Sequence, residues 1–280
     1  MDNTYGMEKL QQVNLYILKE IDRICTKYKL RYSLDAGTLL GAIRHSGFIP
    51  WDDDADIVMT RSNFEVFKKV APRELPPNLS FVMPDDFKGG RAFYDFTPRI
   101  CYLPSARKKK DGQTEYYEGK LNHLWVDIFI LDTLPRGRIT KKGVIFLQKF
   151  FYLLAMGHRY RIEYKKYGLL TRLGVGLFSC IGKRIPMGWI FSWENALSRA
   201  FKKSRSQEVY YSNYQPDYLH IRLKKQWLEK YSRILFEEVP LLVFDEYDII
   251  LSLVYGDYMT PPPRKDRVPT HESTEIQIYG

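Results

Sequence analysis

The sequence predicts an α+β protein in which a mixed β-sheet is flanked by helices. Three observations support this: apolar residues at helical spacing from Glu8 to Lys29, runs of β-branched and aromatic residues from Leu79 to Leu131, and amphipathic, basic stretches within residues 139–205. The chain has 280 residues, of which 45% are apolar and 27% are charged. This length and composition favour a globular unit with an inserted helical part and exclude a largely disordered chain.

The N-terminal elements follow from local patterns. The first helix places apolar residues at intervals of three and four, namely Leu10, Val13, Ile17, Ile21, Ile24 and Tyr28. A short strand from Tyr32 to Leu34, a helix from Thr38, a loop stiffened by Pro50 and a helix from Arg61 to Val70 are expected next. These elements surround an acidic stretch.

Four aspartates lie within five positions, directly before the apolar run Ile57-Val58-Met59; they are Asp52, Asp53, Asp54 and Asp56. Like charges this close repel one another, so they persist in a folded site only with a bound cation or with screening by water. An extended strand would put Asp54 and Asp56 on one face, about 7 Å apart along the chain. Both could then reach one Mg²⁺ or Mn²⁺, a pattern that indicates phosphate chemistry.

Residues upstream of the aspartates suit an anionic ligand. Gly37 and Thr38 stand at the expected helix start, where backbone N–H groups and the helix dipole favour phosphate. Arg44 and His45 stand at its end, where they either bind phosphate or another anionic group, or compensate the helix dipole. We favour binding for both.

The β-rich region carries a further carboxylate. Strands are expected in NLSFVM, RAFYDFTPRICYL and HLWVDIFIL, with turns at residues 88–90 and 108–112. Asp127 lies among apolar residues of the last strand, so it needs a cation or a donor nearby. It fits a third metal-binding carboxylate, and the alternative is a structural ion pair. Asp132 is expected to be a turn or cap residue.

The net charge of +10 is concentrated in one segment. Residues 139–205 contain fourteen Lys or Arg and two acidic residues, so the rest of the chain is slightly negative. Charged residues interrupt both apolar runs of this segment, so neither is long enough to span a membrane. The segment is either a set of interfacial helices on an anionic leaflet or a core-packing helical subdomain with a solvated basic face, and the sequence leaves both open.

The C-terminal part is expected to form a strand over residues 208–214, a hairpin over 236–243 and a helix over 244–255 that ends at Gly256. The three cysteines are far apart and suggest neither a disulfide framework nor a zinc cluster. The first twelve residues are polar and lack the apolar core of a signal peptide, which predicts a cytoplasmic location, with peripheral contact at the inner face of the cell membrane as an extension.

The motif GTLLGAIRHSGFIPWDDDADIVM resembles the signature of the LicD family of phosphotransferases, which is related to the fukutin-related proteins. VDIFILD at Val126 to Asp132 and VYGDYMTPPPRKDRVPTH at Val254 to His271 are also similar to that family. The resemblance implies a nucleotidyltransferase-like fold, with residues 1–138 as catalytic core, 139–205 as basic helical segment and 206–280 completing the catalytic domain.

The resemblance also implies a reaction. A substituted phosphate, foremost phosphocholine, would pass from a CDP-linked donor to a sugar hydroxyl of a cell-surface glycan, such as a teichoic acid, lipopolysaccharide or capsule precursor, with release of CMP. Asp54, Asp56 and Asp127 would hold Mg²⁺ or Mn²⁺, and Asp52 or Asp127 would accept the proton of the acceptor hydroxyl. Arg267 and His271 would close over the nucleotide.

Several alternatives remain at this point. Ribitol phosphate or glycerol phosphate would use the same metal site, whereas choline calls for an aromatic cage, with candidates Phe93, Tyr94, Phe96, Tyr116 and Tyr117. A nucleotidyltransferase acting on a nucleoside triphosphate would release pyrophosphate instead of CMP. A noncatalytic protein that binds anionic surfaces is a remote alternative, and the concentrated aspartates argue against a nucleic-acid partner.

Overall fold

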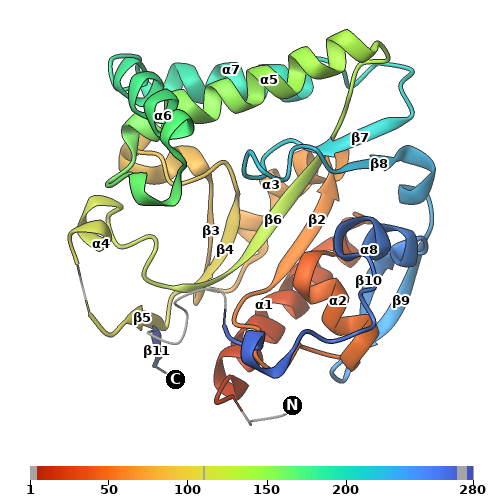
Figure 1. The fold of residues 1–280 in the computed structure, drawn as a ribbon. Helices are drawn as coiled ribbons and strands as arrows, with labels where there is room; N and C mark the ends of the chain where they lie inside the picture. Colours follow the sequence, from red (N-terminus) through yellow and green to blue (C-terminus); the bar gives the residue numbers. More distant parts are fainter. Residues whose placement is uncertain (1–4, 110, 270–275, 280) are drawn as a thin grey trace.

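The computed structural model describes residues 5–109, 111–269 and 276–279, and it contains a curled, mixed sheet flanked by helices (Figure 1). This confirms the predicted fold class. The sheet has the order β1-β2-β6-β4-β3, and β7 pairs with both β6 and β8. Its strands are β1 (Ser33–Leu34), β2 (Asp56–Thr60), β3 (Leu79–Val82), β4 (Arg99–Tyr102), β6 (Leu124–Thr133), β7 (Glu208–Tyr211) and β8 (Arg222–Lys224).

The long strand β6 organises the sheet. Its first half pairs antiparallel with β4, its last residues pair antiparallel with β7, and its middle pairs parallel with β2. In the parallel pair Asp56 stands opposite Asp127. Two acidic residues that are far apart in sequence are therefore neighbours in the sheet.

The N-terminal helices build the core on the sheet. They are α1 (Glu8–Lys27), α2 (Ala36–His45) and α3 (Arg61–Glu74). The apolar faces predicted for α1 and α3 are buried, and Ile17, Ile21 and Phe67 pack in one core with residues of β2 and β6. The structure confirms α1, places the start of α2 two residues before Thr38, and extends α3 beyond Val70.

Part of the predicted β-rich region is not strand. Only residues 99–102 of RAFYDFTPRICYL form a strand, because the preceding loop turns away to pack Phe93 and Phe96 against helices of the basic segment. The predicted turn at 108–112 is followed by a short helix, α4 (Gly112–Tyr116), and preceded by β5 (Ser105–Arg107), which pairs with β11 (Ile276–Ile278).

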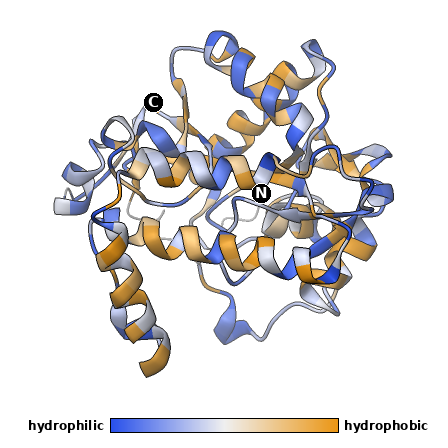
Figure 2. Ribbon diagram, turned by 90° about the horizontal axis from the view of Figure 1, so that it is seen from above, coloured by the Kyte–Doolittle hydropathy of each residue, from blue (hydrophilic) through white to orange (hydrophobic). Residues whose placement is uncertain are grey.

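The basic segment is helical, as predicted, and consists of α5 (Arg138–Ala155), α6 (Leu169–Gly182) and α7 (Met187–Arg199). The last of these begins at Met187, directly after Pro186. Seen from above in Figure 2, hydrophobic and hydrophilic residues alternate along the helices of the molecule. No helix in the described part of the chain is both long and apolar enough to cross a bilayer.

The C-terminal part closes the core. The predicted hairpin is present but longer, formed by β9 (Tyr231–Phe236) and β10 (Val239–Phe244), and it is followed by α8 (Tyr247–Tyr255). Gly256 ends α8 with a φ of 67°, a conformation that favours glycine. Short 3₁₀ turns complete the elements: η1 (Pro84–Gly89), η2 (Met156–His158), η3 (Tyr164–Lys166), η4 (Lys225–Leu228) and η5 (Arg264–Asp266).

Candidate active site

The aspartate stretch is a loop that runs into a strand. The strand β2 begins at Asp56, and residues 52–55 before it are not part of a strand. The alternation that was expected to put Asp54 and Asp56 on one strand face therefore does not apply to Asp54. Instead Asp52, Asp53 and Asp54 each offer a carboxylate oxygen within 4.8 Å of the others, a spacing that one metal ion can bridge.

Asp56 lies beside this cluster at the start of β2. Its backbone oxygen accepts a hydrogen bond from the Asp35 N–H at 3.1 Å, and the Asp127 N–H donates to the oxygen of Ala55 at 3.0 Å. Burial, followed by the charges of Asp54 and Asp127, raises the pKa of Asp56 well above its ordinary value. Burial and Asp54 also raise the pKa of Asp52. The acidic groups thus repel one another in a partly dry site.

This donor set fits a hard divalent cation. Carboxylate oxygens are the ligands that Mg²⁺ and Mn²⁺ prefer, and a cation would offset the repulsion that raises the pKa of Asp52 and Asp56. Among the described residues, the carboxylates close enough to share one metal ion are those of Asp52, Asp53 and Asp54. The metal ligands predicted from the sequence were Asp54, Asp56 and Asp127. The predicted ligand set stays a prediction.

The start of α2 supports the acidic loop. A Cβ added at Gly37 would stand 2.7 Å from the Oδ2 of Asp52, so the absence of a side chain makes room for that carboxylate. The hydroxyl of Thr38 accepts a hydrogen bond from the Asp56 N–H at 2.8 Å and is buried. Both residues therefore position aspartates; their contact with phosphate stays a prediction.

Asp127 sits in an ion pair that the sequence had left as an alternative. Its Oδ1 accepts a hydrogen bond from Arg99 Nε at 3.0 Å, and its Oδ2 accepts one from Trp125 Nε1 at 3.2 Å. The guanidinium of Arg99 also donates a hydrogen bond to Asp95 at 2.8 Å. Its Nη1 has no hydrogen-bond partner among the described residues. Burial raises the pKa of Asp127 to about 6, against the opposing effect of Arg99. The carboxylate is therefore held in one orientation.

A positively charged group forms at the other end of α2. Arg44 donates a hydrogen bond to the backbone oxygen of Tyr258 at 2.9 Å. The rings of His45 and Trp51 meet edge to face, with their centres 6.1 Å apart. The guanidinium of Arg267 lies 5.2 Å from the centre of the Trp51 ring. Burial, with Arg267 as a further cause, lowers the pKa of both Arg44 and His45.

The tertiary structure thus brings His45 and Arg267 to Trp51, with Arg44 beside His45, and an anion would relieve the repulsion between the two guanidinium groups. His271, which was also predicted to bind the nucleotide, lies outside the described residues.

Two predictions are corrected, one about Asp132 and one about the aromatic cage. Asp132 is not a turn residue: it lies within β6, buried, and its carboxylate accepts hydrogen bonds from Arg61 Nε at 3.0 and 3.1 Å. The aromatic cage candidates Phe93, Phe96 and Tyr117 are buried in the core. They pack against neighbouring rings and, for Phe93, against the guanidinium of Arg159 at 5.4 Å.

Aromatic residues that sequence reasoning missed lie close to the aspartates. Tyr211 donates its hydroxyl proton to Asp35 Oδ1 at 2.9 Å, and burial raises the pKa of that carboxyl to about 7. The ring of Tyr214 stacks on Phe129 at 4.3 Å and lies 4.4 Å from the ring of Tyr218. No spacing in the sequence indicates these aromatic contacts. Phe129 lies on β6 and the tyrosines lie on or after β7, so the rings meet only when the chain folds.

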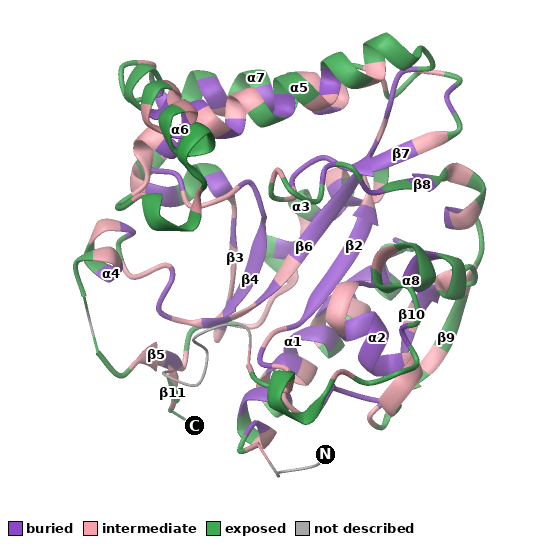
Figure 3. Cartoon of the chain, in the orientation of Figure 1, coloured by how far each residue is buried: buried purple, intermediate pink, exposed green. Residues whose placement is uncertain are grey.

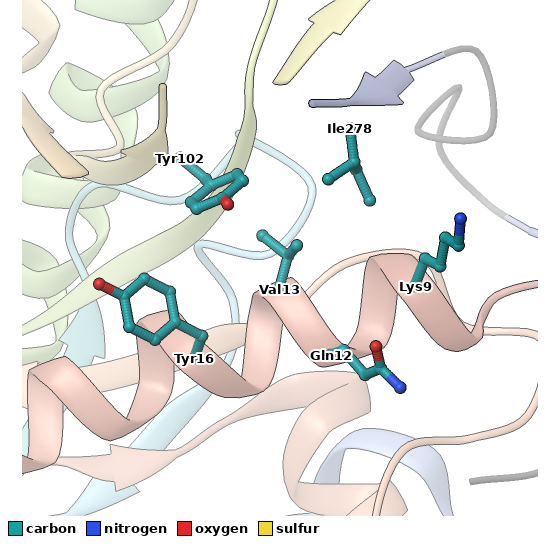
Figure 4. A pocket seen from close by; sticks show the side chains of 6 residues that line it. All are labelled: Lys9, Gln12, Val13, Tyr16, Tyr102 and Ile278. Carbon is teal, nitrogen blue, oxygen red and sulfur yellow. The ribbon is translucent and has the colours of Figure 1, made fainter. Parts of the chain in front are cut away.

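The structure also contains a surface cavity of about 240 Å³ away from the aspartates. It is lined by Lys9, Gln12, Val13, Tyr16, Tyr102 and Ile278, which come from α1, β4 and β11 (Figure 4). Its lining is mixed polar and apolar, and none of the predicted site residues lines it.

Comparison with known proteins places these features in a family. Residues 29–149 match a family model described as "LicD/FKTN/FKRP, nucleotidyltransferase domain", and this region contains α2, the aspartate loop and Asp127. Over 289 aligned residues the chain is 28% identical to the lipopolysaccharide cholinephosphotransferase LicD of Haemophilus influenzae, covering 95% of this chain and 96% of that protein. These two comparisons support the assignment of the chain to the LicD family.

Shorter similarities connect this chain to two uncharacterized proteins of Rickettsia. One from Rickettsia typhi is 36% identical and one from Rickettsia prowazekii is 34% identical, each over 70 residues that make up 25% of this chain and 23% and 26% of theirs. The resemblance read from the motifs is thus confirmed, and the comparisons support a LicD-type transferase.

Proposed function

We propose that this LicD-family protein transfers phosphocholine from a CDP-linked donor to a sugar hydroxyl of a cell-surface glycan, with release of CMP. The similarity over nearly the whole chain to a protein named lipopolysaccharide cholinephosphotransferase supports the transferred group and the class of acceptor. The observation that carries the proposal is the crowded, partly buried carboxylate cluster within the region that matches the nucleotidyltransferase domain.

The residues of the site divide the work between charge and positioning. Asp52, Asp53 and Asp54 would hold Mg²⁺ or Mn²⁺, with Asp56 beside them. When bound, the metal would supply charge neutralisation for the diphosphate. Arg44 and Arg267 offer cationic contacts for the nucleotide phosphates, and His45 beside them is a neutral hydrogen-bonding group.

The transfer step is an in-line displacement. The oxygen of the sugar hydroxyl forms a new bond to the phosphorus of phosphocholine, and the bond from that phosphorus to the oxygen of CMP breaks. The hydroxyl proton passes to the carboxylate of Asp127, whose orientation Arg99 and Trp125 hold. A pKa of about 6 suits this role, because such a carboxylate is ionised at neutral pH and still basic enough to accept a proton.

The choline head group has a candidate contact surface in the tyrosines near the aspartates. Burial, and then the nearby charges of Asp56 and Asp35, raises the pKa of Tyr214. Tyr218 is adjacent and 42% exposed, so its ring is open to a ligand. Aromatic faces hold a quaternary ammonium by cation–π attraction, which a ribitol or glycerol group would not use.

The test is CMP release by the purified chain with CDP-choline, CDP-ribitol and CDP-glycerol, with and without Mg²⁺, and with a membrane glycolipid extract as acceptor. We expect metal-dependent CMP release from CDP-choline that Asp54→Asn abolishes. Pyrophosphate from a nucleoside triphosphate, without CMP from any donor, would instead identify a nucleotidyltransferase. Release from CDP-ribitol or CDP-glycerol alone would reassign the donor within the same chemistry.

Three variants then separate the possible ligand sets. Loss of transfer in Asp53→Asn together with Asp54→Asn favours the cluster of Asp52, Asp53 and Asp54. Retained transfer in Asp53→Asn with loss in Asp56→Asn favours the set of Asp54, Asp56 and Asp127. For the head group, Tyr218→Ala should raise KM for CDP-choline while Tyr218→Phe keeps it, because phenylalanine retains the aromatic face.

Because such an acceptor is assembled on a lipid, we also propose a cytoplasmic enzyme that works at the inner face of the cell membrane.

A further inference from the structure

The helix α6 exposes a stripe of large apolar side chains. Leu170, Leu173 and Leu177 are 85%, 65% and 59% exposed, and Leu169 and Ile181 extend the stripe to both ends of the helix. Arg172 is the one charged residue within α6. A contiguous apolar surface of this kind on a folded chain indicates contact with another apolar phase.

The opposite face of α6 shows that the helix is firmly docked. Val175 and Ser179 are buried against the rest of the helical layer. At its C-terminal end, a Cβ added at Gly182 would stand 1.9 Å from the Leu154 oxygen of α5, so the two backbones meet directly. The leucine stripe is therefore the outer face of a fixed helix, and in Figure 3 exposed residues run along α6.

Exposed aromatic residues on the other two helices of the layer have the character of an interface between water and lipid. On α7, Trp189 is 62% exposed and its ring centre lies 6.3 Å from that of Trp193. Phe146 of α5 is also exposed. Tryptophan favours the boundary between headgroups and acyl chains, because its ring is apolar and its N–H is polar.

The charge around the stripe selects the kind of partner. Residues 139–205 carry fourteen Lys or Arg and two acidic residues. Exposed basic residues stand before α6, at Lys165 and Lys166, and after it, at Lys183 and Arg184. A second copy of this face would bring like charges together, and a nucleic acid would leave the leucines without an apolar contact. An anionic bilayer satisfies both features at once.

We propose that α5, α6 and α7 form a docking face for an anionic lipid bilayer, with Leu170, Leu173 and Leu177 entering the boundary of the acyl chains and the flanking lysines contacting lipid phosphates. The inference rests on the proposed location at the inner membrane face, and its test uses no donor or acceptor. A failure of lipid binding would therefore leave the assignment of the reaction untouched.

The experiment is vesicle flotation of the full chain with phosphatidylcholine vesicles, with and without phosphatidylglycerol. We expect binding only with phosphatidylglycerol, weakening as salt rises, and a blue shift of tryptophan emission that Trp189→Phe reduces. The double variant Leu173→Ser/Leu177→Ser should weaken binding more than about tenfold, since two leucine side chains no longer leave water.

The matched control is Leu235→Ser on β9, which is as exposed as Leu177 at 59% but lies on another part of the molecule. It should bind vesicles like the parent chain. The proposal is overturned if phosphatidylglycerol vesicles do not bind the parent chain, or if the control loses as much binding as the double variant. A stable dimer in sedimentation equilibrium that the double variant dissociates would also overturn it, by assigning the stripe to a second copy.

Discussion

A buried glutamate in the helical layer makes the stability of this protein depend on pH. Glu194 of α7 accepts hydrogen bonds from Ser198 Oγ at 2.8 Å and from Gln148 Nε2 at 3.4 Å, and the same Gln148 amide reaches the Tyr210 hydroxyl at 3.0 Å. Burial raises the pKa of Glu194 from 4.5 to about 7, although these hydrogen bonds oppose the shift. The neutral carboxylic acid is therefore the form that the fold prefers.

The sign follows from proton binding. In the unfolded chain Glu194 releases its proton near pH 4.5, whereas the folded protein holds it up to about pH 7. Between these values the folded state binds more protons, so its stability falls as pH rises. At 1.36 kcal/mol per pKa unit the total loss is about 3 kcal/mol, complete above the folded pKa. Glu194→Gln has no titratable group at this position, so the variant lacks this loss of stability with rising pH.

The assay is urea unfolding of the parent chain and Glu194→Gln between pH 4 and pH 8, followed by circular dichroism. We expect the variant to gain about 3 kcal/mol relative to the parent over this range, because the other carboxyls with raised pKa values contribute equally to both proteins. Parallel stability curves, with a constant difference at every pH, would refute the assignment of a raised pKa to Glu194.

Three further predictions concern the site and the helical layer. Arg99→Met should lower the free energy of unfolding by about 3–5 kcal/mol, because it leaves Asp127 without its buried partner, and a loss below about 1 kcal/mol in urea unfolding would contradict the buried pair. Gly182→Ala should destabilise by about 1–3 kcal/mol in the same assay, since its Cβ would overlap the α5 backbone, whereas Gly174→Ala on the same helix meets no atom within 4 Å and should be neutral or stabilising. Mg²⁺ at about one hundred times its Kd should raise the free energy of unfolding of the parent by about 2.7 kcal/mol and leave Asp54→Asn unchanged; an equal rise in both would place the ion elsewhere.

Much of the architecture was predictable because it is encoded locally. The spacing of apolar residues identified α1 and α3, and the concentration of basic residues identified the helical segment that became α5, α6 and α7. The expected strand at RAFYDFTPRICYL was mostly wrong, since burial of Phe93 and Phe96 under the helical layer outweighed the strand propensity of the segment. Propensity does not report which neighbours a side chain will meet.

The sequence by itself determined that four carboxylates crowd together before an apolar strand, because adjacent residues cannot separate by more than the chain allows. Only the tertiary structure decided how they are arranged. The parallel register of β2 and β6 sets Asp127 opposite Asp56, the antiparallel register of β4 brings Arg99 to Asp127, and packing on Trp51 brings Arg267 to the end of α2. These contacts join residues that are distant in sequence, so strand register and core packing, which no local pattern encodes, determine them.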